Sequence, residues 1–265
     1  MGAKTSCRLL VDPPAEGTWN MALDEALLNA SLESQLATLR FYQWSRPTLS
    51  LGYFQRYEDR TGHLASQIVP VVRRLSGGGA ILHDREVTYS LSLPASHHLA
   101  SDTQALYDAL HATLIEFLQG AILQATPSWK TVRCASPSKS PASQVPFLCF
   151  ERRFLGDILL LNEAAPASRI EHKIVGSAQR RRRGGVLQHG SILLSRSPMA
   201  PELSGIQEIT RIAIHPEDLF SALPDALAHA LNLDLQTGPM PNDLRNLAQK
   251  IQREKYEVDT WTQRR

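Results

Sequence analysis

The chain has 265 residues, which is long enough for one large or two small domains with a substantial buried core. Its 28 basic and 26 acidic side chains leave a formal net charge of +2, so the global charge gives no support for nucleic-acid binding. No apolar leader opens the chain and no run of about 18 apolar residues occurs in it, so we expect a soluble, cytoplasmic protein without a membrane partner.

Predicted elements in the first third of the chain are mostly strands. Residues 7–11 form an apolar run typical of a strand. Asn20 stands where a helix N-cap would, because apolar residues follow it at helical spacing. Residues 36–44 and 48–54 are strand-like, and the turn signal Arg46-Pro47 between them predicts a hairpin.

Two further strands and a helix follow. Residues 68–72 are typical of a buried strand, whereas residues 87–93 alternate apolar and polar side chains as a half-buried strand does. A helix is predicted from residue 102 to about residue 119, with Ser101 or Asp102 available as its cap.

The second half of the chain predicts a loop, three strands and two helices. Residues 126–147 are rich in Ser, Pro and Lys, which indicates a flexible surface loop. Later elements are expected at 154–161, 173–178 and 186–194 for strands and at 216–231 and 241–255 for helices. Because this order lacks βαβ regularity, we predict an α+β fold with a largely antiparallel mixed sheet flanked by helices, in one domain over residues 1–265.

Three consecutive glycines, at 77–79, stand between the arginine pair at 73–74 and the dipeptide His83-Asp84. Glycine lets the main chain approach a ligand closely, although it costs roughly 0.5–1 kcal/mol in a regular element. The segment lacks the Lys-Ser/Thr ending of a P-loop, and no helix pattern follows it as in a dinucleotide-binding motif. It predicts a backbone-exposing loop that two rigid strands hold in place.

A second segment with small residues runs from Lys173 to Gln179, and four arginines, 180–183, follow it before a Gly-Gly turn and the sequence Gln188-His189-Gly190-Ser191. A charge run in a hairpin is typical of a solvated turn, and the alternative is a patch for an acidic protein partner.

The glycine segment and this second segment together resemble the biotin and lipoate protein ligase superfamily, specifically its lipoate ligase and octanoyltransferase branch. Residues 20–28, 40–42, 49–55 and 255–261 carry the same resemblance. It implies a single catalytic domain with the fold of class II aminoacyl-tRNA synthetases and biotin ligases. Residues 126–147 match poorly, and residues 162–171 are an insertion relative to the usual hairpin of the family.

Cys149 is the candidate nucleophile. The three cysteines, Cys7, Cys134 and Cys149, are odd in number and widely spaced, which argues against a disulfide framework and a metal site. A cysteine among apolar neighbours is by itself typical of an inert buried thiol. The resemblance implies otherwise for Cys149, since octanoyltransferases carry the acyl group as a thioester on a cysteine at this place. It also implies that Lys173 lies against the acyl carbonyl, where a cation favours the thiolate and stabilises the oxyanion.

The resemblance further implies a pocket for the acyl group. Arg74 is expected at its mouth, and the glycine backbone is expected against the acyl chain or its carbonyl. We expect His83-Asp84 to orient the loop through hydrogen bonds and prefer this role to that of a general base. For His189 the same two roles remain open. Tunnel lining or ordinary core is expected of Ile81, Leu82, Val175 and Ile192. The full set of expected acyl- or substrate-binding residues is Arg74, Ser76, Gly77, Gly78, Gly79, Ala80, Ile81, Leu82, His83, Gly176, Ser177, Ala178, His189 and Gly190.

The implied reaction has two steps and no cofactor. Octanoyl passes from octanoyl-acyl carrier protein to Cys149 and then to a lysine of a lipoyl-domain protein such as glycine cleavage H protein. One rival function is that of an ATP-dependent lipoate-protein ligase that uses ATP and Mg²⁺, although the chain is expected to lack the additional C-terminal domain of many such ligases. The same motifs are also compatible with an amidotransferase between lipoyl domains and, least of all, with a non-catalytic acyl-protein binding module.

Overall fold

A mixed sheet of eight strands forms the centre of the computed structural model, which describes residues 3–123, 126, 128–137, 145–164 and 171–265. Strand β1 runs parallel to both of its neighbours, β11 and β2, and all other neighbouring strands are antiparallel. The strands are, in their order across the sheet, β11 (Leu233–Thr237), β1 (Thr5–Val11), β2 (Ala37–Tyr42), β6 (Glu86–Leu93), β10 (Gly185–Leu193), β9 (Glu171–Arg182), β8 (Ile158–Asn162) and β7 (Trp129–Arg133). The predicted α+β class with a largely antiparallel sheet is confirmed.

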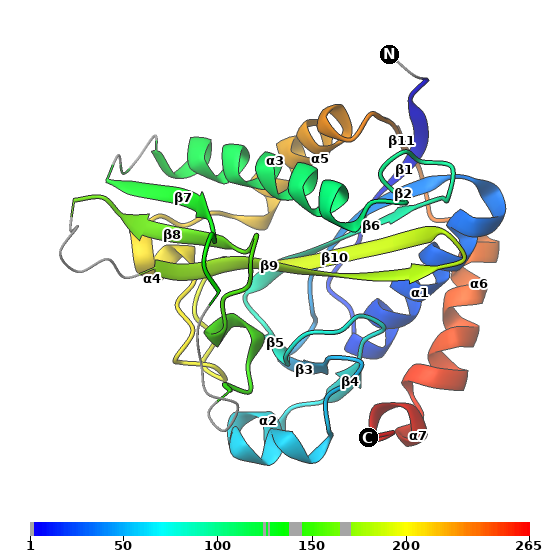
Figure 1. Ribbon diagram of the computed structural model, residues 1–265. Coiled ribbons are helices and arrows are strands. Elements are labelled where there is room, and N and C mark those ends of the chain that lie inside the picture. The colour runs from blue at the N-terminus through cyan, green and yellow to red at the C-terminus, as the bar shows by residue number, and fades with distance from the viewer. Residues whose placement is uncertain (1–2, 124–125, 127, 138–144, 165–170) are drawn as a thin grey trace.

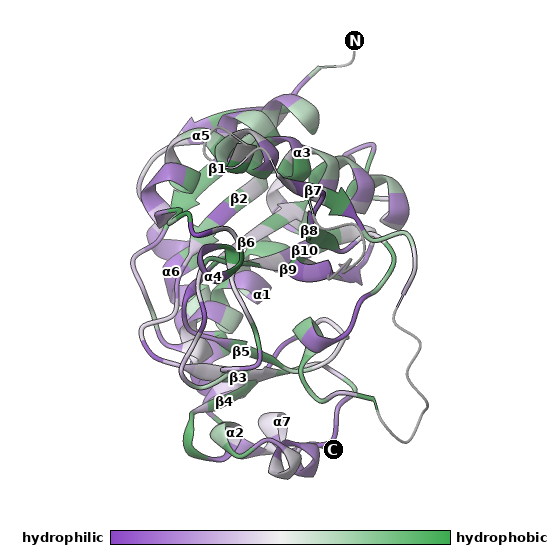
Figure 2. Ribbon diagram, turned by 90° about the vertical axis from the view of Figure 1, so that its left-hand side faces the viewer, coloured by the Kyte–Doolittle hydropathy of each residue, from purple (hydrophilic) through white to green (hydrophobic). Residues whose placement is uncertain are grey.

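Helices cover both faces of this sheet, as the side view shows (Figure 2). On one face, α3 (Thr103–Leu123) and α5 (Pro216–Ala230) pack on the main core. On the other face, α1 (Gly17–Ser34) packs against α6 (Asn242–Ile251). None of the helices in the described ranges is long and apolar enough to cross a membrane.

A second, three-stranded sheet lies on the α1 side of the molecule (Figure 1). Its central strand β3 (Thr48–Leu51) pairs with β4 (Val71–Arg73) and β5 (Ile81–His83), so it holds both ends of the glycine loop. The short helices are α2 (Ala65–Ile68), α4 (Ile206–Thr210) and α7 (Asp259–Thr262), together with a π-helical turn at Gln252–Tyr256 and 3₁₀ turns at Glu58–Gly62 and Cys149–Glu151.

Several predicted elements are confirmed. Strands β1, β9 and β10 and helices α5 and α6 occur where the patterns placed them. Asp102 caps α3, because its Oδ1 accepts hydrogen bonds from the backbone N–H groups of Gln104 and Ala105.

The predicted hairpin over residues 36–54 is wrong, because β2 and β3 belong to different sheets. Between them Trp44 packs inward and stacks on His83 at 3.8 Å between ring centroids, which carries the chain from one sheet to the other. The predicted cap at Asn20 is also wrong. The helix begins at Gly17, and the Asn20 amide is buried where it donates to the carbonyls of Ala15 and Gln43.

Burial explains two other differences. The segment 68–72 divides at Pro70 into the end of α2 and the start of β4, and Ile68 is 77% exposed. Strand β6 is buried at every position, not half-buried, because its polar side chains face α1, where Ser90 donates a hydrogen bond to Asp24.

The predicted loop over residues 126–147 contains strand β7, which pairs antiparallel with β8. Its β-branched residues Thr131 and Val132 fit a strand, and Thr131 is buried against α3, where it bonds Gln119. Strand β8 starts at Ile158, later than expected, and β11 was not predicted. Most of the insertion expected at 162–171 lies outside the described residues.

Candidate active site

A cavity of about 410 Å³ opens between β9, β10, the glycine loop and the segment from Cys149 to Asp157. This volume is in the usual range for small-ligand sites. Among the predicted residues that line it are Arg74, Gly77, Gly78, Ile81, Cys149, Lys173, Gly176, Ser177, Ala178, His189 and Gly190. Lining residues that the sequence did not single out are Thr103, Gln104, Tyr107, Phe150, Phe154, Leu155, Asp157 and Gln179.

Cys149 is held at the cavity by the end of the glycine loop. Its backbone N–H donates to the Ala80 carbonyl at 2.6 Å, and the Ala80 N–H donates to the Phe147 carbonyl at 3.2 Å. A Cβ atom at Gly79 would lie 3.2 Å from Cys149 Cα, so the third glycine permits this close approach. Cys149 is partly exposed, whereas Cys7 and Cys134 are buried, and burial raises the pKa of Cys7 to about 12. Cys149 is therefore the thiol with access to a ligand.

The ammonium group of Lys173 lies next to this thiol. Lys173 Nζ is 3.7 Å from Cys149 Sγ and donates to the carbonyls of Cys149 and Arg152 at 3.3 and 3.2 Å. It also forms a buried ion pair with Asp157 Oδ2 at 2.7 Å. A cation at this distance stabilises a thiolate.

Asp157 is a site residue that the sequence reasoning missed. Burial raises the pKa of this carboxyl even though the charge of Lys173 opposes the shift. Its Oδ2 also accepts a hydrogen bond from the Phe154 N–H at 2.7 Å, which closes the turn before β8. A Gly-Asp pair directly before the apolar run of β8 was the available signal, because Gly156 has φ 88 and an acidic side chain beside a buried strand needs a partner.

Small residues on β9 and β10 leave room for the lysine and for a ligand. A Cβ atom at Gly176 would be 2.8 Å from Lys173 Cε, so the lysine side chain runs along β9 over this glycine. A Cβ atom at Gly190 would be 2.6 Å from both Ser177 Oγ and Tyr89 Oη. Either substitution would displace a polar group of the site.

Arg74 is not at the mouth of the cavity in the way expected. It is 3% exposed and holds the loop from beneath, since its Nη2 donates to the carbonyls of Gly77 and Gly79 at 2.7 Å each. Burial lowers the pKa of Arg74 to about 10, so it remains charged at neutral pH. Gly78 has φ 92, and a Cβ atom at Gly52 would lie 2.1 Å from the Gly78 carbonyl oxygen. Glycines on both sides of this contact therefore let β3 and the loop touch.

His83 stands behind the loop, not in the cavity. Its Nε2 bonds Ser50 Oγ at 2.7 Å, and Ser50 Oγ in turn accepts from Arg74 at 3.1 Å, so His83 supports the loop through two intermediates. Its Nδ1 bonds Glu86 at 2.5 Å. Asp84 instead accepts from Ser197. Four other residues of the predicted binding set do not line the cavity: Ser76, Gly79, Ala80 and Leu82. Of the residues considered as tunnel lining or core, three are core residues: Leu82, Val175 and Ile192.

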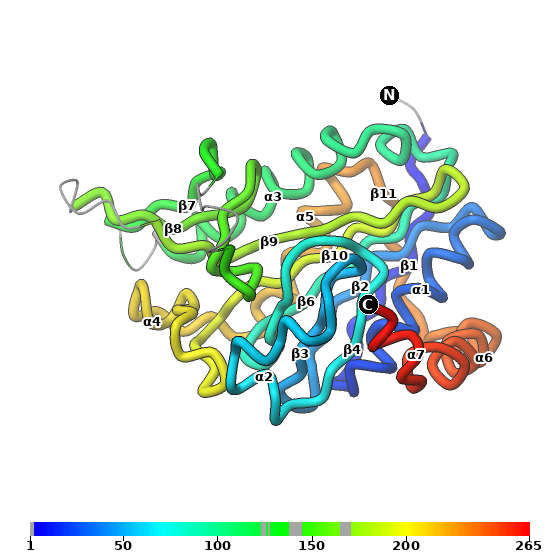
Figure 3. Tube along the Cα trace, turned by 60° about the horizontal axis from the view of Figure 1, so that its bottom comes forward, coloured from blue at the N-terminus to red at the C-terminus, as the bar shows by residue number. Residues whose placement is uncertain are grey.

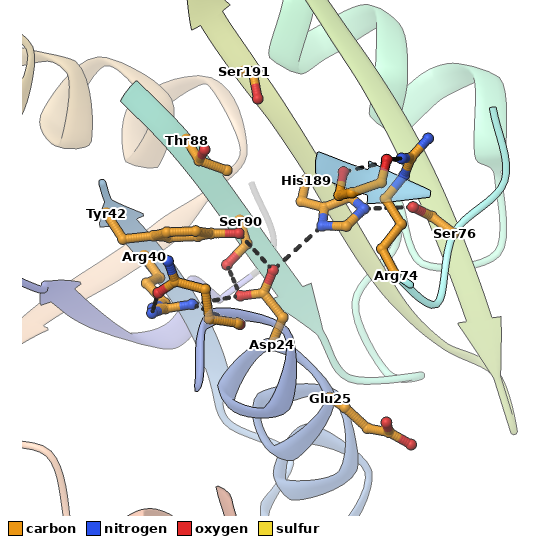
Figure 4. A network of polar contacts seen from close by, with 12 residues as sticks. Asp24, Glu25, Arg40, Tyr42, Arg74, Ser76, Thr88, Ser90, His189 and Ser191 are labelled. Carbon is orange, nitrogen blue, oxygen red and sulfur yellow. Dashed lines mark hydrogen bonds and ion pairs between the residues drawn. The ribbon is translucent and has the colours of Figure 1, made fainter. Parts of the chain in front are cut away.

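A buried network ties His189 to α1 and to the loop (Figure 4). His189 Nδ1 lies 3.3 Å from Asp24 Oδ2, and its Nε2 lies 2.5 Å from Ser76 Oγ. Since a carboxylate only accepts hydrogen bonds, His189 Nδ1 carries the proton in its contact with Asp24. Asp24 also accepts from Arg40 at 2.9 Å and from Tyr42 at 3.0 Å.

The charge on Asp24 is secured by these partners. Burial alone would raise its pKa, but the hydrogen bond from His189 and the charge of Arg40 outweigh burial and lower it. Arg40 also pairs with Asp12 at 2.6 Å. The arrangement fixes the ring orientation of His189 at the cavity wall, and Asp24 was not among the predicted site residues.

A second histidine supports the far side of β9. The imidazole of His111 on α3 donates from Nδ1 to the Gly156 carbonyl at 2.7 Å, and its Nε2 lies 2.5 Å from Ser177 Oγ. Ser177 Oγ also bonds the hydroxyl of Tyr89. Burial lowers the pKa of His111 from 6.5 to about 4, so the ring is neutral at pH 7.

We expect this histidine to make the protein acid-labile. His111 binds a proton at a higher pH in the unfolded chain than in the folded chain. Its contribution to the free energy of unfolding is therefore complete above pH 6.5 and is lost as the pH falls toward 4. The difference between 6.5 and 4 corresponds to a loss of about 3 kcal/mol at pH 4. Urea unfolding at pH 7 and pH 4.5 measures it. His111→Asn should flatten this dependence, and an equally steep fall in that variant would contradict the assignment.

The chain is similar to known proteins along nearly its whole length. Residues 16–204 match the family model for the lipoyl protein ligase A/B catalytic domain. The chain is 31% identical to octanoyltransferase LipM of Geobacillus kaustophilus, over 96% of this chain and 95% of that protein. It is 30% identical to octanoyltransferase LipM of Kyrpidia tusciae, over 97% of this chain and 98% of that protein.

Solved structures share the fold. A lipoate-protein ligase A bound with ATP superposes with a TM-score of 0.73 at 19% identity, over 98% of this chain and 99% of that one. The bi-partite lipoate protein ligase of Thermoplasma acidophilum superposes with a TM-score of 0.68 at 19% identity, over 98% of this chain and 96% of that one. At this identity the likeness extends to the fold alone.

Proposed function

The chain belongs to the lipoyl protein ligase A/B catalytic domain family, and from this membership we infer that it is an octanoyltransferase that carries the octanoyl group on Cys149. Relatives named octanoyltransferase that match along nearly the whole chain support the activity. The distance of 3.7 Å between Lys173 Nζ and Cys149 Sγ, at the wall of the cavity, supports the route through a thioester.

In the first half-reaction the donor is octanoyl-acyl carrier protein. The Cys149 thiolate attacks the thioester carbonyl, and the carbon–sulfur bond to the carrier breaks as the carrier thiolate leaves. Lys173 donates a hydrogen bond to the oxyanion of the tetrahedral intermediate. One thioester replaces another, so this step needs no energy source and no cofactor.

In the second half-reaction the acceptor is a lysine of a lipoyl-domain protein, with glycine cleavage H protein as the proposed example. The neutral ε-amine attacks the Cys149 thioester, loses a proton and forms an amide, while Cys149 returns as a thiolate. An amide is more stable than a thioester, so this step is downhill. A structural analysis that includes a solved chain of the same fold describes a bi-partite lipoate protein ligase and its E2 lipoyl domain, which supports a lipoyl domain as acceptor.

The acyl chain is bound by the apolar part of the cavity. Aromatic and aliphatic side chains line it, and each methylene buried there contributes roughly 0.8 kcal/mol. Those side chains are Ile81, Tyr107, Phe150, Phe154 and Leu155.

Intact-protein mass spectrometry tests this function. The wild-type protein is incubated with octanoyl-carrier protein in the absence of ATP and Mg²⁺, and an adduct of one octanoyl group that a lipoyl domain then removes is expected. The rival function is an ATP-dependent lipoate-protein ligase. Product that forms only from free acid with ATP and Mg²⁺, without an adduct on the enzyme, would establish the ligase instead.

A further inference from the structure

Two arginines from distant parts of the chain meet at one aromatic ring. The Cζ atom of Arg180, in β9, lies 4.9 Å from the centroid of the Tyr53 ring, and the Cζ atom of Arg264 lies 3.8 Å from it. The pKa of the Tyr53 phenol is lowered because it is hydrogen-bonded to Arg264 and lies in the field of both guanidinium groups. The cationic groups thus converge on one spot, which we call the Tyr53 patch (Tyr53, Arg180 and Arg264).

These two arginines lack carboxylate partners among the residues that the structure describes. The Nε atom of Arg180 is buried and has no hydrogen-bond partner within those same residues. Its neighbours in the arginine run differ, since Arg182 pairs with Glu25 and Arg181 bonds Thr103. Unneutralised guanidinium groups around one phenol make a site for an anion, and phosphate is, with carboxylate, an anion whose geometry a guanidinium group matches.

The Tyr53 patch adjoins the cavity on two sides. The backbone N–H of Tyr53 donates to the Ser76 carbonyl at 2.8 Å, so the patch is attached to the glycine loop. Arg180 follows Gln179, which lines the cavity. The last residues of the chain pass beside the small sheet (Figure 3), where the Tyr57 N–H donates to the Arg265 carbonyl at 2.8 Å. This contact anchors the C-terminal segment, which contains Arg264, beside the small sheet that holds the glycine loop.

The patch also lies on the same face of β9 as the reacting groups. Positions 176, 178 and 180 face one side of β9, because side-chain directions alternate along a strand. A Cβ atom at Gly176 would be 3.0 Å from Lys173 Nζ, so the lysine ammonium and the adjacent Cys149 sulfur lie on this face as well. His189 of β10 is paired with Ala178 of β9, so its side chain lies on this face too. The glycine loop, which His189 contacts through Ser76, is therefore on the same side of the sheet.

The separation along this face matches the length of a carrier arm. From Gly176, at the level of the lysine ammonium, four strand residues lead to Arg180, which is about 13 Å. A phosphopantetheine arm has about as many bonds between its sulfur and its phosphorus as four residues of extended chain, which span about 13–14 Å. An arm with its thioester at Cys149 therefore reaches Arg180 with its phosphate when it lies along β9.

On the basis of the proposed transfer from an acyl carrier, we propose that Arg180 and Arg264 bind the phosphodiester of the donor's phosphopantetheine arm at the Tyr53 patch. The arm then lies over Ala178, and its thioester carbonyl is directed to Cys149 and Lys173. The patch is partly exposed to solvent, so its effect weakens as ionic strength rises.

The test compares three octanoyl thioesters as donors: octanoyl-pantetheine, octanoyl-phosphopantetheine and octanoyl-carrier protein. Acylation of Cys149 is followed by mass spectrometry, and kcat/KM is determined for each donor. The variant Arg180→Gln/Arg264→Gln should lose about tenfold to a hundredfold with both phosphorylated donors and remain within about twofold of wild type with octanoyl-pantetheine. The control is Arg245→Gln, an exposed arginine of α6, which should not change any of the three rates.

Several outcomes would overturn the proposal. An equal loss with octanoyl-pantetheine would mean that the arginines only maintain the structure. A loss confined to octanoyl-carrier protein would assign the patch to the protein surface of the carrier, and a raised KM for the lipoyl domain alone would assign it to the acceptor. Failure of the proposed function is recognised separately, because wild-type enzyme would then not be acylated by octanoyl-pantetheine at any concentration.

Discussion

Replacing Cys149 with alanine is expected to reduce octanoyl transfer by a factor on the order of 10⁵–10⁶, as the loss of a nucleophile does in other enzymes. Cys149 is partly exposed and contributes only a thiol to the cavity, so the free energy of unfolding should change by less than about 1 kcal/mol. Single-turnover transfer from octanoyl-carrier protein to a lipoyl domain measures the rate, and thermal unfolding measures the stability.

Two further variants sharpen this result. Cys149→Ser should form an octanoyl ester slowly, because a hydroxyl is a weaker nucleophile than a thiolate. Cys7→Ala removes a buried thiol in β1, away from the cavity, and should leave the transfer rate unchanged. If Cys149→Ala transferred octanoyl as fast as wild type, the thioester route would be excluded.

Replacing Lys173 with methionine is expected to have the next largest effect, in two separable parts. Acylation of Cys149 should slow by about 10²–10³-fold, because the oxyanion loses its donor and the thiolate loses its cation. The fold should also lose about 3–5 kcal/mol, because Asp157 keeps a buried charge without its partner at 2.7 Å.

The double variant Lys173→Met/Asp157→Asn separates the two parts. Asparagine removes the buried charge, so most of the stability should return while acylation stays slow. Stopped-flow acylation and urea unfolding of wild type and both variants provide the comparison. Recovery of both properties together would mean that Lys173 acts on the rate only through the fold.

The parts of the fold that local signals determine were predicted correctly. Asp102 precedes an apolar stripe and caps α3 as expected, since capping depends on a few neighbouring residues. The hairpin over residues 36–54 failed because a turn signal at Pro47 does not specify the sheet in which the following strand pairs. Strand β7 was missed since its polar sequence context hides the burial of Thr131 against α3.

The candidate site was predicted unevenly for a related reason. The resemblance placed Cys149 and Lys173 in the candidate site, and the run of glycines marked the loop. The structure brings these residues together at one cavity. Asp24 and Asp157 were missed because an acidic residue gains its role from partners that are distant in the chain. Arg74 was expected at the mouth of the cavity, but its position under the loop depends on the carbonyl groups of Gly77 and Gly79, which no pattern reveals.

The hydrogen bonds of Lys173 have a further consequence for the loaded enzyme. Its ammonium group has three hydrogens, yet four acceptors lie within reach: Asp157 Oδ2, the carbonyls of Cys149 and Arg152, and Cys149 Sγ. An acyl oxygen gains a hydrogen from Lys173 only when one of these acceptors gives up its own. The two carbonyl acceptors belong to the short turn that carries the nucleophile, and the Asp157 bond is the shortest of the four. The contact to Cys149 Sγ is the longest of the four at 3.7 Å, and a thioester sulfur accepts more weakly than a thiolate. On the proposed route Lys173 therefore redirects this hydrogen to the acyl oxygen and keeps its bonds to Asp157 and to the turn at residues 149–152.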